Sequence, residues 1–305
     1  MTRVLIVGAG GVGRRHVQVL AGLAGVELTG VVDPVVRAAE TLAAERGVPA
    51  YADLEEALDR GSPDAVYVCV PPFAHGEPER AALDRGLPIF VEKPVGLDLS
   101  VAEDIGRRVE KAGVVTGTGY HWRCLDTVTE AKRLLAQSPP LLANGYWLDK
   151  RPPVAWWAQG DRSGGQIVEQ LTHVLDLARA LLGDAEEVYA AGARLADSPP
   201  DRGDIDDATV ATVRFASGAV ASFSATSLLA TKHRASLTTF SRGLAMEISE
   251  GGLVLHDGRP AGLWRARKQG ARLALETEWF GAPVELRDEA ERLAALRGAE
   301  LDYAA

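Results

Sequence analysis

Short apolar runs alternate with longer segments of helical spacing over the first 118 residues. The runs at residues 4–7, 26–32, 64–70, 87–91 and 114–118 show little polar alternation, which is typical of strands buried on both faces. A further short strand is expected near residue 51, and helices are expected at about 12–23, 35–46, 53–60, 74–85 and 99–112. Strands that alternate with helices predict an α/β Rossmann domain, which is a doubly wound parallel sheet.

The pattern changes after residue 118. A helix is expected up to about residue 137, followed by a strand at 141–148, an aromatic loop at 151–157 and a strongly apolar helix at about 166–182. Short β runs then occur at 187–195, 208–215, 219–226, 235–241, 244–248 and 253–256, before a last helix at about 285–296. This order predicts an α+β domain with a large, mostly antiparallel, open-faced sheet. We therefore expect a Rossmann domain at 1–119, a substrate-binding and oligomerisation domain at 120–284, and a short C-terminal helix and tail at 285–305.

The composition narrows the class of protein. A formal net charge of −9 argues against a nucleic-acid partner, because phosphate backbones are bound by basic patches. No apolar run approaches the ~20 residues that cross a bilayer, and the run at residues 4–7 is too short for a signal peptide. Two cysteines, Cys69 and Cys124, do not indicate a disulfide framework. We therefore expect a cytoplasmic protein without a membrane partner.

A glycine-rich loop joins the first strand to the first helix. Gly8 permits a tight turn, Gly10 lets the backbone approach a pyrophosphate, and Gly13 allows close packing of helix and strand. The helix N-terminus offers unpaired N–H groups and the positive end of the helix dipole to a phosphate. Asp33 ends the next strand, where its carboxylate suits a ribose diol and repels a 2′-phosphate. We expect NAD, rather than NADP, to contact Gly8, Gly10, Gly11, Val12, Gly13 and Asp33. The alternative is a purely structural glycine turn.

Two later segments follow strands at the edge where open parallel sheets bind ligands. Glu92-Lys93-Pro94 comes after the strand at 87–91, and Pro94 restricts Lys93 to extended geometry, with a cis Lys93–Pro94 bond as one option. We expect Lys93 to be functional rather than a solvated surface lysine. Pro71 and His75 follow the strand at 64–70, and we expect both, together with Glu92 and Lys93, to contact the cofactor. For His75 the alternative is a residue that starts a helix.

The apolar helix expected at 166–182 carries a polar stripe. Glu169, His173 and Asp176 are spaced i, i+4 and i+7, which places them on one face of a continuous helix. Polar groups on so apolar a helix must be paired or must line a cavity. One interpretation is a buried histidine held by two acidic neighbours. A metal site is disfavoured because no second histidine stands at ligand spacing, so we expect no metal. General acid–base catalysis is the favoured interpretation.

Four motifs, taken in order, make the sequence resemble the Gfo/Idh/MocA family of glucose–fructose oxidoreductase, inositol dehydrogenase and rhizopine-catabolism oxidoreductases. They are Gly8-x-Gly10-Gly11-x-Gly13, Glu92-Lys93-Pro94, Ser163-Gly164-Gly165 and His173-Val174-Leu175-Asp176, over residues 1 to about 285. The resemblance implies a Rossmann domain, an open-faced sheet that builds dimers or tetramers, a catalytic lysine at Lys93 and a catalytic histidine at His173. Two departures stand out. Glu169 replaces the aspartate of many members, and the C-terminus is short, so we expect the edge of the site or the subunit contact to differ.

These features predict hydride transfer between NAD and a hydroxyl or keto carbon of a sugar or cyclitol. His173 would accept the alcohol proton, Lys93 would stabilise charge on the reacting oxygen, and Glu169 would orient His173 or bind a neighbouring hydroxyl. Candidates for substrate contact are Tyr120, Arg123, Trp156, Trp157 and Asp176. For the tryptophans, core positions are the alternative. Two other functions stay open: an NAD-retaining glycosidase or epimerase, and a non-catalytic dinucleotide-binding sensor.

Overall fold

The computed structural model describes residues 1–196, 203–249, 252–256, 259–269, 272–279, 283, 285–296 and 299–302. The chain folds into two compact units. The first comprises Met1–Tyr120, Arg151–Thr172 and Gly192–Thr209, and the second comprises His121–Lys150, His173–Ala191 and Val210–Ala305. The domain bounds expected from the sequence, 1–119, 120–284 and 285–305, stay a prediction, and the first unit takes in two segments from beyond residue 119.

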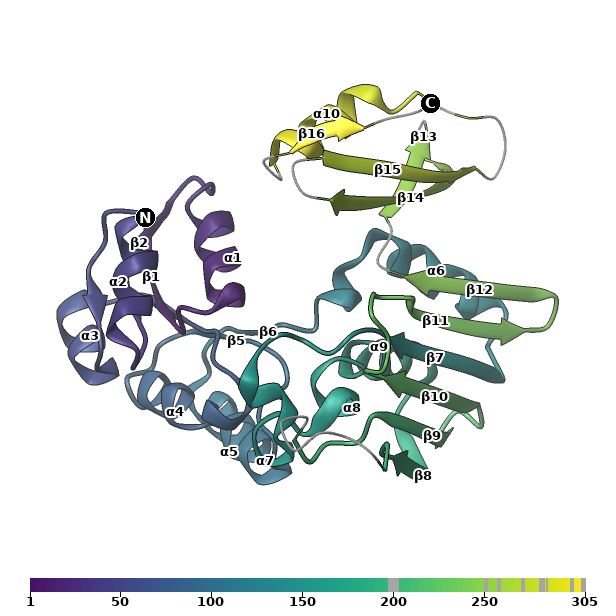
Figure 1. Ribbon diagram of the computed structural model, residues 1–305, viewed down its shortest axis with the longest axis horizontal. Helices are drawn as coiled ribbons and strands as arrows, with labels where there is room; N and C mark the ends of the chain where they lie inside the picture. Colours follow the sequence, from purple (N-terminus) through teal and green to yellow (C-terminus); the bar gives the residue numbers. More distant parts are fainter. Residues whose placement is uncertain are drawn as a thin grey trace. The chain divides into compact units, whose positions relative to one another are not determined.

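A six-stranded parallel sheet forms the centre of the first unit (Figure 1). Its strands are β1 (Thr2–Val7), β2 (Val26–Val32), β3 (Ala50–Tyr51), β4 (Ala65–Val68), β5 (Ile89–Val91) and β6 (Thr116–Thr118), in the order β3-β2-β1-β4-β5-β6. All neighbouring strands pair in parallel. The helices of this region are α1 (Gly11–Leu20), α2 (Val36–Ala44), α3 (Leu54–Gly61), α4 (Glu77–Asp84) and α5 (Leu99–Ala112). The doubly wound α/β fold predicted from the apolar runs is confirmed.

Successive residues of β1 enter two different hydrophobic cores. Leu5 and Val7 pack in the core that contains Val66, whereas Val4 and Ile6 pack in a second core with side chains of α1 and α2. Burial on both faces explains why the strand sequences are apolar without alternation. Since the strands are parallel, their carboxyl ends share one edge, and the loops after β1, β4 and β5 begin there.

The second unit contains a six-stranded mixed sheet in the order β12-β11-β7-β10-β9-β8 (Figure 1). Its strands are β7 (Leu142–Leu148), β8 (Ala185–Ala193), β9 (Ala208–Phe215), β10 (Val220–Thr226), β11 (Arg234–Ser241) and β12 (Leu244–Ser249). β7 pairs antiparallel with β11 and parallel with β10, and β11 pairs antiparallel with β12. Helices α6 (Asp126–Gln137) and α9 (Thr172–Leu182) accompany the sheet. The predicted α+β class, with a mostly antiparallel sheet, is confirmed.

One face of this mixed sheet is covered and the other is open. On the covered face α9 lies so close that a Cβ on Gly145 of β7 would be 2.8 Å from Val174 and 2.4 Å from Phe223 of β10. Only a residue without a side chain fits there. The neighbouring side chains on the opposite face include Leu142 and Val220, which are 42% and 41% exposed. The sheet therefore has the open face that the alternating pattern predicts.

A separate four-stranded sheet corrects the expectation for the C-terminal third. β13 (Gly252–His256) pairs with β14 (Arg259–Gln269), which pairs with β15 (Arg272–Trp279), and the order is β13-β14-β15-β16. After α10 (Arg287–Leu296), β16 (Glu300–Asp302) pairs in parallel with β15. The sequence analysis placed the 253–256 run in the large sheet and expected no strands afterwards. Four basic residues interrupt the pattern of β14, and β16 is three residues long, so neither gives a clear periodic signal.

The single helix expected at 166–182 is wrong, because the structure has two helices there. α8 (Gly165–Glu169) ends before α9 begins. Gln170 and Leu171 both donate their N–H groups to the carbonyl oxygen of Gln166, and the second bond spans five residues instead of four. Such a widened turn shifts the helical phase. The spacing between Glu169 and His173 therefore no longer places them on one face.

The described part of the chain contains neither a disulfide bond between its two cysteines nor a helix that could cross a membrane. Cys69 and Cys124 are both free thiols, the first buried and the second exposed. Among the described helices, none combines the length and the hydropathy that crossing a bilayer requires.

Candidate active site

The loop between β1 and α1 has the geometry that a dinucleotide phosphate needs. Gly8 has a φ of +103°, and a Cβ there would lie 2.4 Å from the carbonyl oxygen of Cys69. A Cβ on Gly13 would lie 1.9 Å from the carbonyl oxygen of Gly8, so helix and loop touch at this point. By contrast, a Cβ on Gly10 or Gly11 would meet nothing within 4 Å, and α1 starts without a side-chain cap. The first N–H groups of α1 are therefore available to an anion.

Asp33 lies directly after β2 and is half-buried. Its two carboxylate oxygens accept the N–H groups of Ala9 and Val35, each at 2.8 Å. These bonds fix the carboxylate beside the glycine loop, and each oxygen keeps a further lone pair for a ribose hydroxyl. Val12, in the first turn of α1, is 42% exposed. Open backbone at the glycines and a fixed negative charge next to them fit the pyrophosphate and the diol of NAD.

Lys93 is held at the end of β5 by one acidic residue. Its bond to Pro94 is cis, which confirms the option that the sequence left open. Nζ of Lys93 donates to Oε1 and to the backbone carbonyl of Glu169, both at 2.7 Å. The other carboxylate oxygen of Glu169 accepts the indole N–H of the fully buried Trp157 at 3.0 Å. Since the two charged side chains are only 14% and 17% exposed, these charge-assisted bonds fix the position of the ammonium.

Glu92 ties the end of β5 to α1. Its Oε1 lies 2.8 Å from Nε2 of His16, and its Oε2 accepts the N–H of Lys93 at 3.1 Å. The His16 ring also packs against Tyr67 and Phe90, with ring centroids 5.5 and 5.0 Å away. Burial acts to raise the pKa of Glu92, but the hydrogen bonds from His16 and from the N–H of Lys93, with their charges, outweigh it and lower the pKa. Glu92 is therefore ionised, and its hydrogen bonds connect the backbone of Lys93 to His16 of α1.

His75 lies between η1 (Pro72–Ala74) and α4, and its side chain is fully buried. Nδ1 of His75 is 2.6 Å from Oε1 of Glu79, whose Oε2 accepts the N–H of Gly76 at 2.6 Å. Glu79 thereby caps α4, as expected for the helix-start alternative. Nε2 of His75 has no hydrogen-bond partner among the described residues. Pro71, which precedes η1, is half-buried.

The aromatic loop gives its two tryptophans different surroundings. Trp157, in η3 (Ala155–Ala158), is fully buried and contacts Glu169. Trp156 is half-buried, and its ring meets that of Phe73 edge-on, with centroids 6.4 Å apart. Arg162, on α7 (Gly160–Ser163), places its guanidinium 5.0 Å over the same Phe73 ring. Of the two tryptophans, Trp156 thus keeps a surface that a substrate could reach.

His173 begins the buried face of α9 in the second unit and is 5% exposed. The ring of His121, in η2 (His121–Cys124), meets it at 66° with centroids 4.6 Å apart. The indoles of Trp122 and Trp147 lie 6.4 and 5.8 Å from it, at 16° and 29°. Both tryptophans are buried. His173 therefore sits in an aromatic cluster with one other imidazole.

Arg123 and Asp176, both predicted to contact substrate, bind each other. Nε and Nη2 of Arg123 donate to the two carboxylate oxygens of Asp176 at 2.5 and 2.6 Å. This fork ties η2 to α9 one turn beyond His173. Tyr120, the residue before η2, is half-buried.

The structure thus places several of the predicted site residues in direct contact with one another. Asp33 joins the glycine loop, Lys93 joins Glu169, and Arg123 joins Asp176. The sequence analysis did not single out His16, Glu79 or His121, whose partners lie on other elements or in the next helical turn. Among the residues described, no group of three or more histidine, cysteine, aspartate or glutamate side chains could hold a metal ion.

Comparison with known proteins gives two matching family models. The model of the oxidoreductase family with an NAD-binding Rossmann fold (GFO_IDH_MocA) matches residues 2–120. The model of the GFO/IDH/MocA C-terminal domain matches residues 139–247. Together they cover more than half of the chain. The first model matches the region of the parallel sheet, and the second matches the region of the mixed sheet.

Relatives with assigned names show the same likeness. Scyllo-inositol 2-dehydrogenase (NAD(+)) of Bacillus subtilis is 30% identical over 224 residues, which are 71% of this chain and 65% of that protein. The 2,7-anhydro-N-acetylneuraminate hydratase of Mediterraneibacter gnavus is 28% identical over 217 residues, 69% of this chain and 57% of that protein. The crystal structure of GenD2 from gentamicin A biosynthesis, in complex with NAD, has a TM-score of 0.75 at 23% identity, covers 81% of this chain and 72% of its own, and shows likeness in fold.

The matched region spans 65% and 57% of the lengths of these two curated relatives. Both family models and the glycine loop nevertheless agree on one assignment. The chain belongs to the Gfo/Idh/MocA oxidoreductase family, and its N-terminal domain has the NAD-binding Rossmann fold of that family.

Proposed function

We propose that the protein is an NAD-dependent dehydrogenase or reductase that acts on a CH–OH or keto carbon of a small sugar or cyclitol. The observation that carries this proposal is Lys93. Its ammonium stands at the carboxyl edge of an NAD-binding sheet, fixed by two 2.7 Å bonds to Glu169. A fixed cation at that edge suits an oxygen that gains negative charge when a hydride leaves its carbon.

The roles we propose for the chain's residues follow from their partners. Lys93 donates a hydrogen bond to the reacting oxygen, and Glu169 positions Lys93. His173 accepts the alcohol proton during oxidation and returns it during reduction. NAD, when bound, supplies the hydride acceptor of its nicotinamide ring.

The cofactor contacts we propose are those of the glycine loop and Asp33. The N–H groups at the start of α1 bind the pyrophosphate, with Gly8, Gly10, Gly11, Val12 and Gly13 shaping the loop. Asp33 binds the ribose diol and favours NAD over NADP. We place Pro71, His75 and Glu92 around the nicotinamide end, where Glu92 acts through Lys93 and the buried His75 acts through the loop it anchors.

For the substrate we propose a polyol held by Tyr120 and Trp156. Trp157 holds Glu169 in place, and Arg123 and Asp176 hold η2 against α9. The inositol dehydrogenase among the relatives supports a cyclitol. We retain the cytoplasm as the compartment, which the two free thiols support.

A second candidate is an enzyme that retains its cofactor and shows no net NADH formation. The observation that favours it is the hydratase among the relatives, at 28% identity. In such an enzyme the hydride leaves and returns, and the same lysine and histidine serve both half-reactions.

The test is an absorbance measurement at 340 nm with purified protein, NAD and a panel of inositols and aldoses, with NADP in parallel. A substrate-dependent rise with NAD, lost in a Lys93→Met variant, is the expected result. Product formation without a rise at 340 nm would favour the cofactor-retaining enzyme. If NAD binds in calorimetry, but no panel member reacts with NAD and no keto-sugar is reduced with NADH, the protein acts as a sensor and the proposal is wrong.

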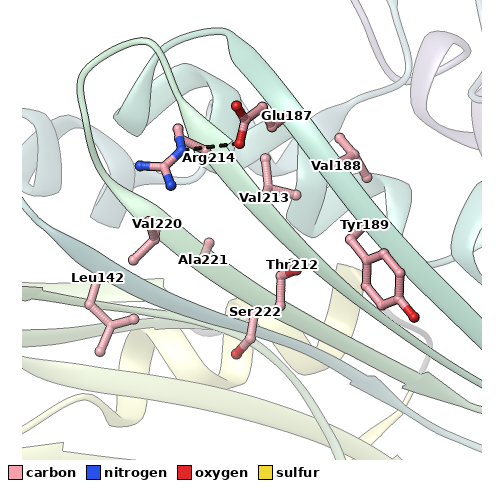
Figure 2. A pocket seen from close by; sticks show the side chains of 10 residues that line it. All are labelled: Leu142, Glu187, Val188, Tyr189, Thr212, Val213, Arg214, Val220, Ala221 and Ser222. Carbon is pink, nitrogen blue, oxygen red and sulfur yellow. Dashed lines mark hydrogen bonds and ion pairs between the residues drawn. The ribbon is translucent and has the colours of Figure 1, made fainter.

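We also propose that the open face of the large sheet joins a second copy of the chain, in a homodimer or homotetramer. Figure 2 shows a hollow on this sheet, where side chains of β8, including Tyr189, lie beside those of β9 and β10. Tyr189 is 73% exposed, and Glu187, two positions earlier on the same face of β8, pairs with Arg214. An exposed apolar sheet face is typical of an interface, and the same patch on two copies can pair by two-fold symmetry.

Light scattering tests this contact. A Tyr189→Glu variant is expected to have the mass of a monomer, because a carboxylate within the contact would be desolvated. A Val115→Glu variant, at an 81% exposed position of the first unit, is the control and is expected to keep the wild-type mass. Equal masses for both variants would contradict the proposed interface.

A further inference from the structure

Two histidines of the second unit differ sharply in exposure although their rings touch. His173 is 5% exposed, whereas His121 is an exposed residue on η2. Their ring centroids are 4.6 Å apart at 66°. We propose that His121 relays protons between His173 and solvent. This inference rests on the proposed function, in which His173 is the acid–base group.

The surroundings of His173 explain why a relay is needed. The near-parallel rings of Trp122 and Trp147 lie against its imidazole, and both tryptophans are buried. An indole has one N–H donor and no acceptor, so neither tryptophan can take up a proton. Among the described aromatic rings in contact with His173, His121 alone carries nitrogens that can both accept and donate a proton.

The position of His121 is fixed by its neighbours in the chain. Trp122 is fully buried beside Trp147, with ring centroids 5.9 Å apart. Arg123 grips both carboxylate oxygens of Asp176 on α9. These two anchors follow His121 directly and hold η2 against the helix that carries His173, so the approach of the two imidazoles does not depend on a mobile loop.

The charged side chains near the two imidazoles include those of Arg123, Asp176 and Lys232. Arg123 and Asp176 neutralise each other next to it. Lys232, from the segment between β10 and β11, places Nζ 4.5 Å from the centre of the Trp147 ring, on the indole that packs against His173. A single proton that passes between two imidazoles adds one positive charge to the pair rather than two.

The proton balance of the relay is simple. When an alcohol is oxidised, the O–H bond breaks and an N–H bond forms on His173. That N–H then breaks as an N–H forms on His121, and the other nitrogen of the His121 ring releases a proton to water. Each turnover therefore leaves both imidazoles with their starting charge. The N–H of His121 has moved to its other ring nitrogen, and proton exchange with water at this exposed ring restores the starting tautomer before the next turnover. Reduction runs the same steps in reverse.

The activity test uses the wild type, His121→Gln, His121→Ala and the control His233→Gln, which changes another exposed histidine of the same unit. The assay contains NAD and scyllo-inositol, or the fastest member of the polyol panel, in dilute buffer. We expect kcat to fall at least about tenfold in both His121 variants, and imidazole to restore most of it in His121→Ala. The control is expected to match the wild type.

The outcomes separate a relay from a structural role. A kcat within twofold of wild type in dilute buffer would overturn the proposal. A low kcat that imidazole does not restore would overturn it too, because a ring that merely packs is not replaced by a soluble base. Recovery with rising imidazole supports the relay.

A second measurement keeps the relay distinct from the proposed function. If the wild type shows no turnover on the whole panel, the proposed function fails, and nitrogen NMR titration of the histidine rings decides the relay. We expect His121→Gln to change the titration midpoint of His173, because two rings that share a proton titrate together. An unchanged His173 midpoint would overturn the inference.

Discussion

The cluster around Lys93 and the cluster around His173 are held together by different kinds of interaction. In the first unit, the ammonium of Lys93 is bound twice by Glu169, whose remaining carboxylate oxygen is bound by Trp157. In the second unit, His173 lies among the rings of His121, Trp122 and Trp147. Hydrogen bonds to charged groups contribute about 1.5–3 kcal/mol each, whereas aromatic contacts contribute about 0.5–1.5 kcal/mol.

The difference teaches how each cluster can serve a reaction. A charge held by several short bonds keeps one position and one state. An imidazole enclosed by rings is oriented by packing, and packing leaves its ring nitrogens able to gain and lose a proton. The first arrangement suits electrostatic stabilisation and the second suits proton transfer. The comparison predicts that mutations in the two clusters respond differently to pH.

The largest effect is expected at the fixed charge. Lys93→Met keeps the length of the side chain but removes the ammonium, so the reacting oxygen loses its donor and Glu169 loses its cation. We expect kcat to fall about 10²–10³-fold or more, at every pH, while NAD still binds in calorimetry. Lys132→Met, at an exposed position on α6, is the control. Near-normal turnover in Lys93→Met would remove the lysine from the chemistry.

A similar but pH-dependent effect is expected at His173. His173→Asn removes the base, and we expect kcat to fall about 10²-fold or more near neutral pH. Raising the pH should recover part of this loss, because hydroxide replaces the missing base, whereas Lys93→Met should not recover. A kcat–pH profile of both variants checks this contrast. Parallel profiles would show that the two clusters do not have separate roles.

A smaller effect is expected at the cofactor diol. Asp33→Ala removes the carboxylate that also binds the N–H groups of Ala9 and Val35. We expect the NAD dissociation constant to rise about tenfold, from the loss of about 1.5 kcal/mol, and the preference over NADP to shrink. Titration calorimetry with both cofactors measures this. An exposed acid, Asp59, provides the control variant Asp59→Ala. Unchanged preference would remove Asp33 from cofactor selection.

The smallest effect is expected at Glu92, and it is one of stability. Its folded-state pKa is lowered, so its charge stabilises the fold above the ordinary carboxyl pKa, and this contribution is lost as the pH falls through the lowered value. We expect Glu92→Gln to be less stable than wild type by about 1 kcal/mol at pH 7. The gap should close in acid. Urea unfolding at both pH values tests this, with the exposed Glu27→Gln as control. A gap that persists in acid would contradict the charged role.

The sequence predicted the first unit better than the second for a physical reason. The bounds of β2 and α5 match the predicted ranges because each apolar pattern is local and complete. The glycine loop and Asp33 were predictable because the strand, loop and helix that carry them form one continuous stretch of sequence with a recognisable pattern. The cis bond at Pro94 was predictable only as an option, because surrounding contacts select the isomer.

Other features depend on contacts that no local pattern carries. His121 and His173 are 52 positions apart, and nothing near either residue indicates that their rings meet. β16 forms by pairing with β15 across α10. The break between α8 and α9 depends on one carbonyl, that of Gln166, accepting a bond from five residues ahead. Apolar periodicity continues through that break, so the helix appeared continuous.

That widened turn also sets a rule for changing the length of the chain. One residue inserted or deleted between Glu169 and His173 would rotate everything after it by about 100° about the helix axis. Val174 would then leave the notch at Gly145, and His173 would leave its aromatic neighbours. A change of length therefore costs contacts at both positions, so engineered libraries of this protein should keep the residue count of this turn and the fully buried Leu171 within it.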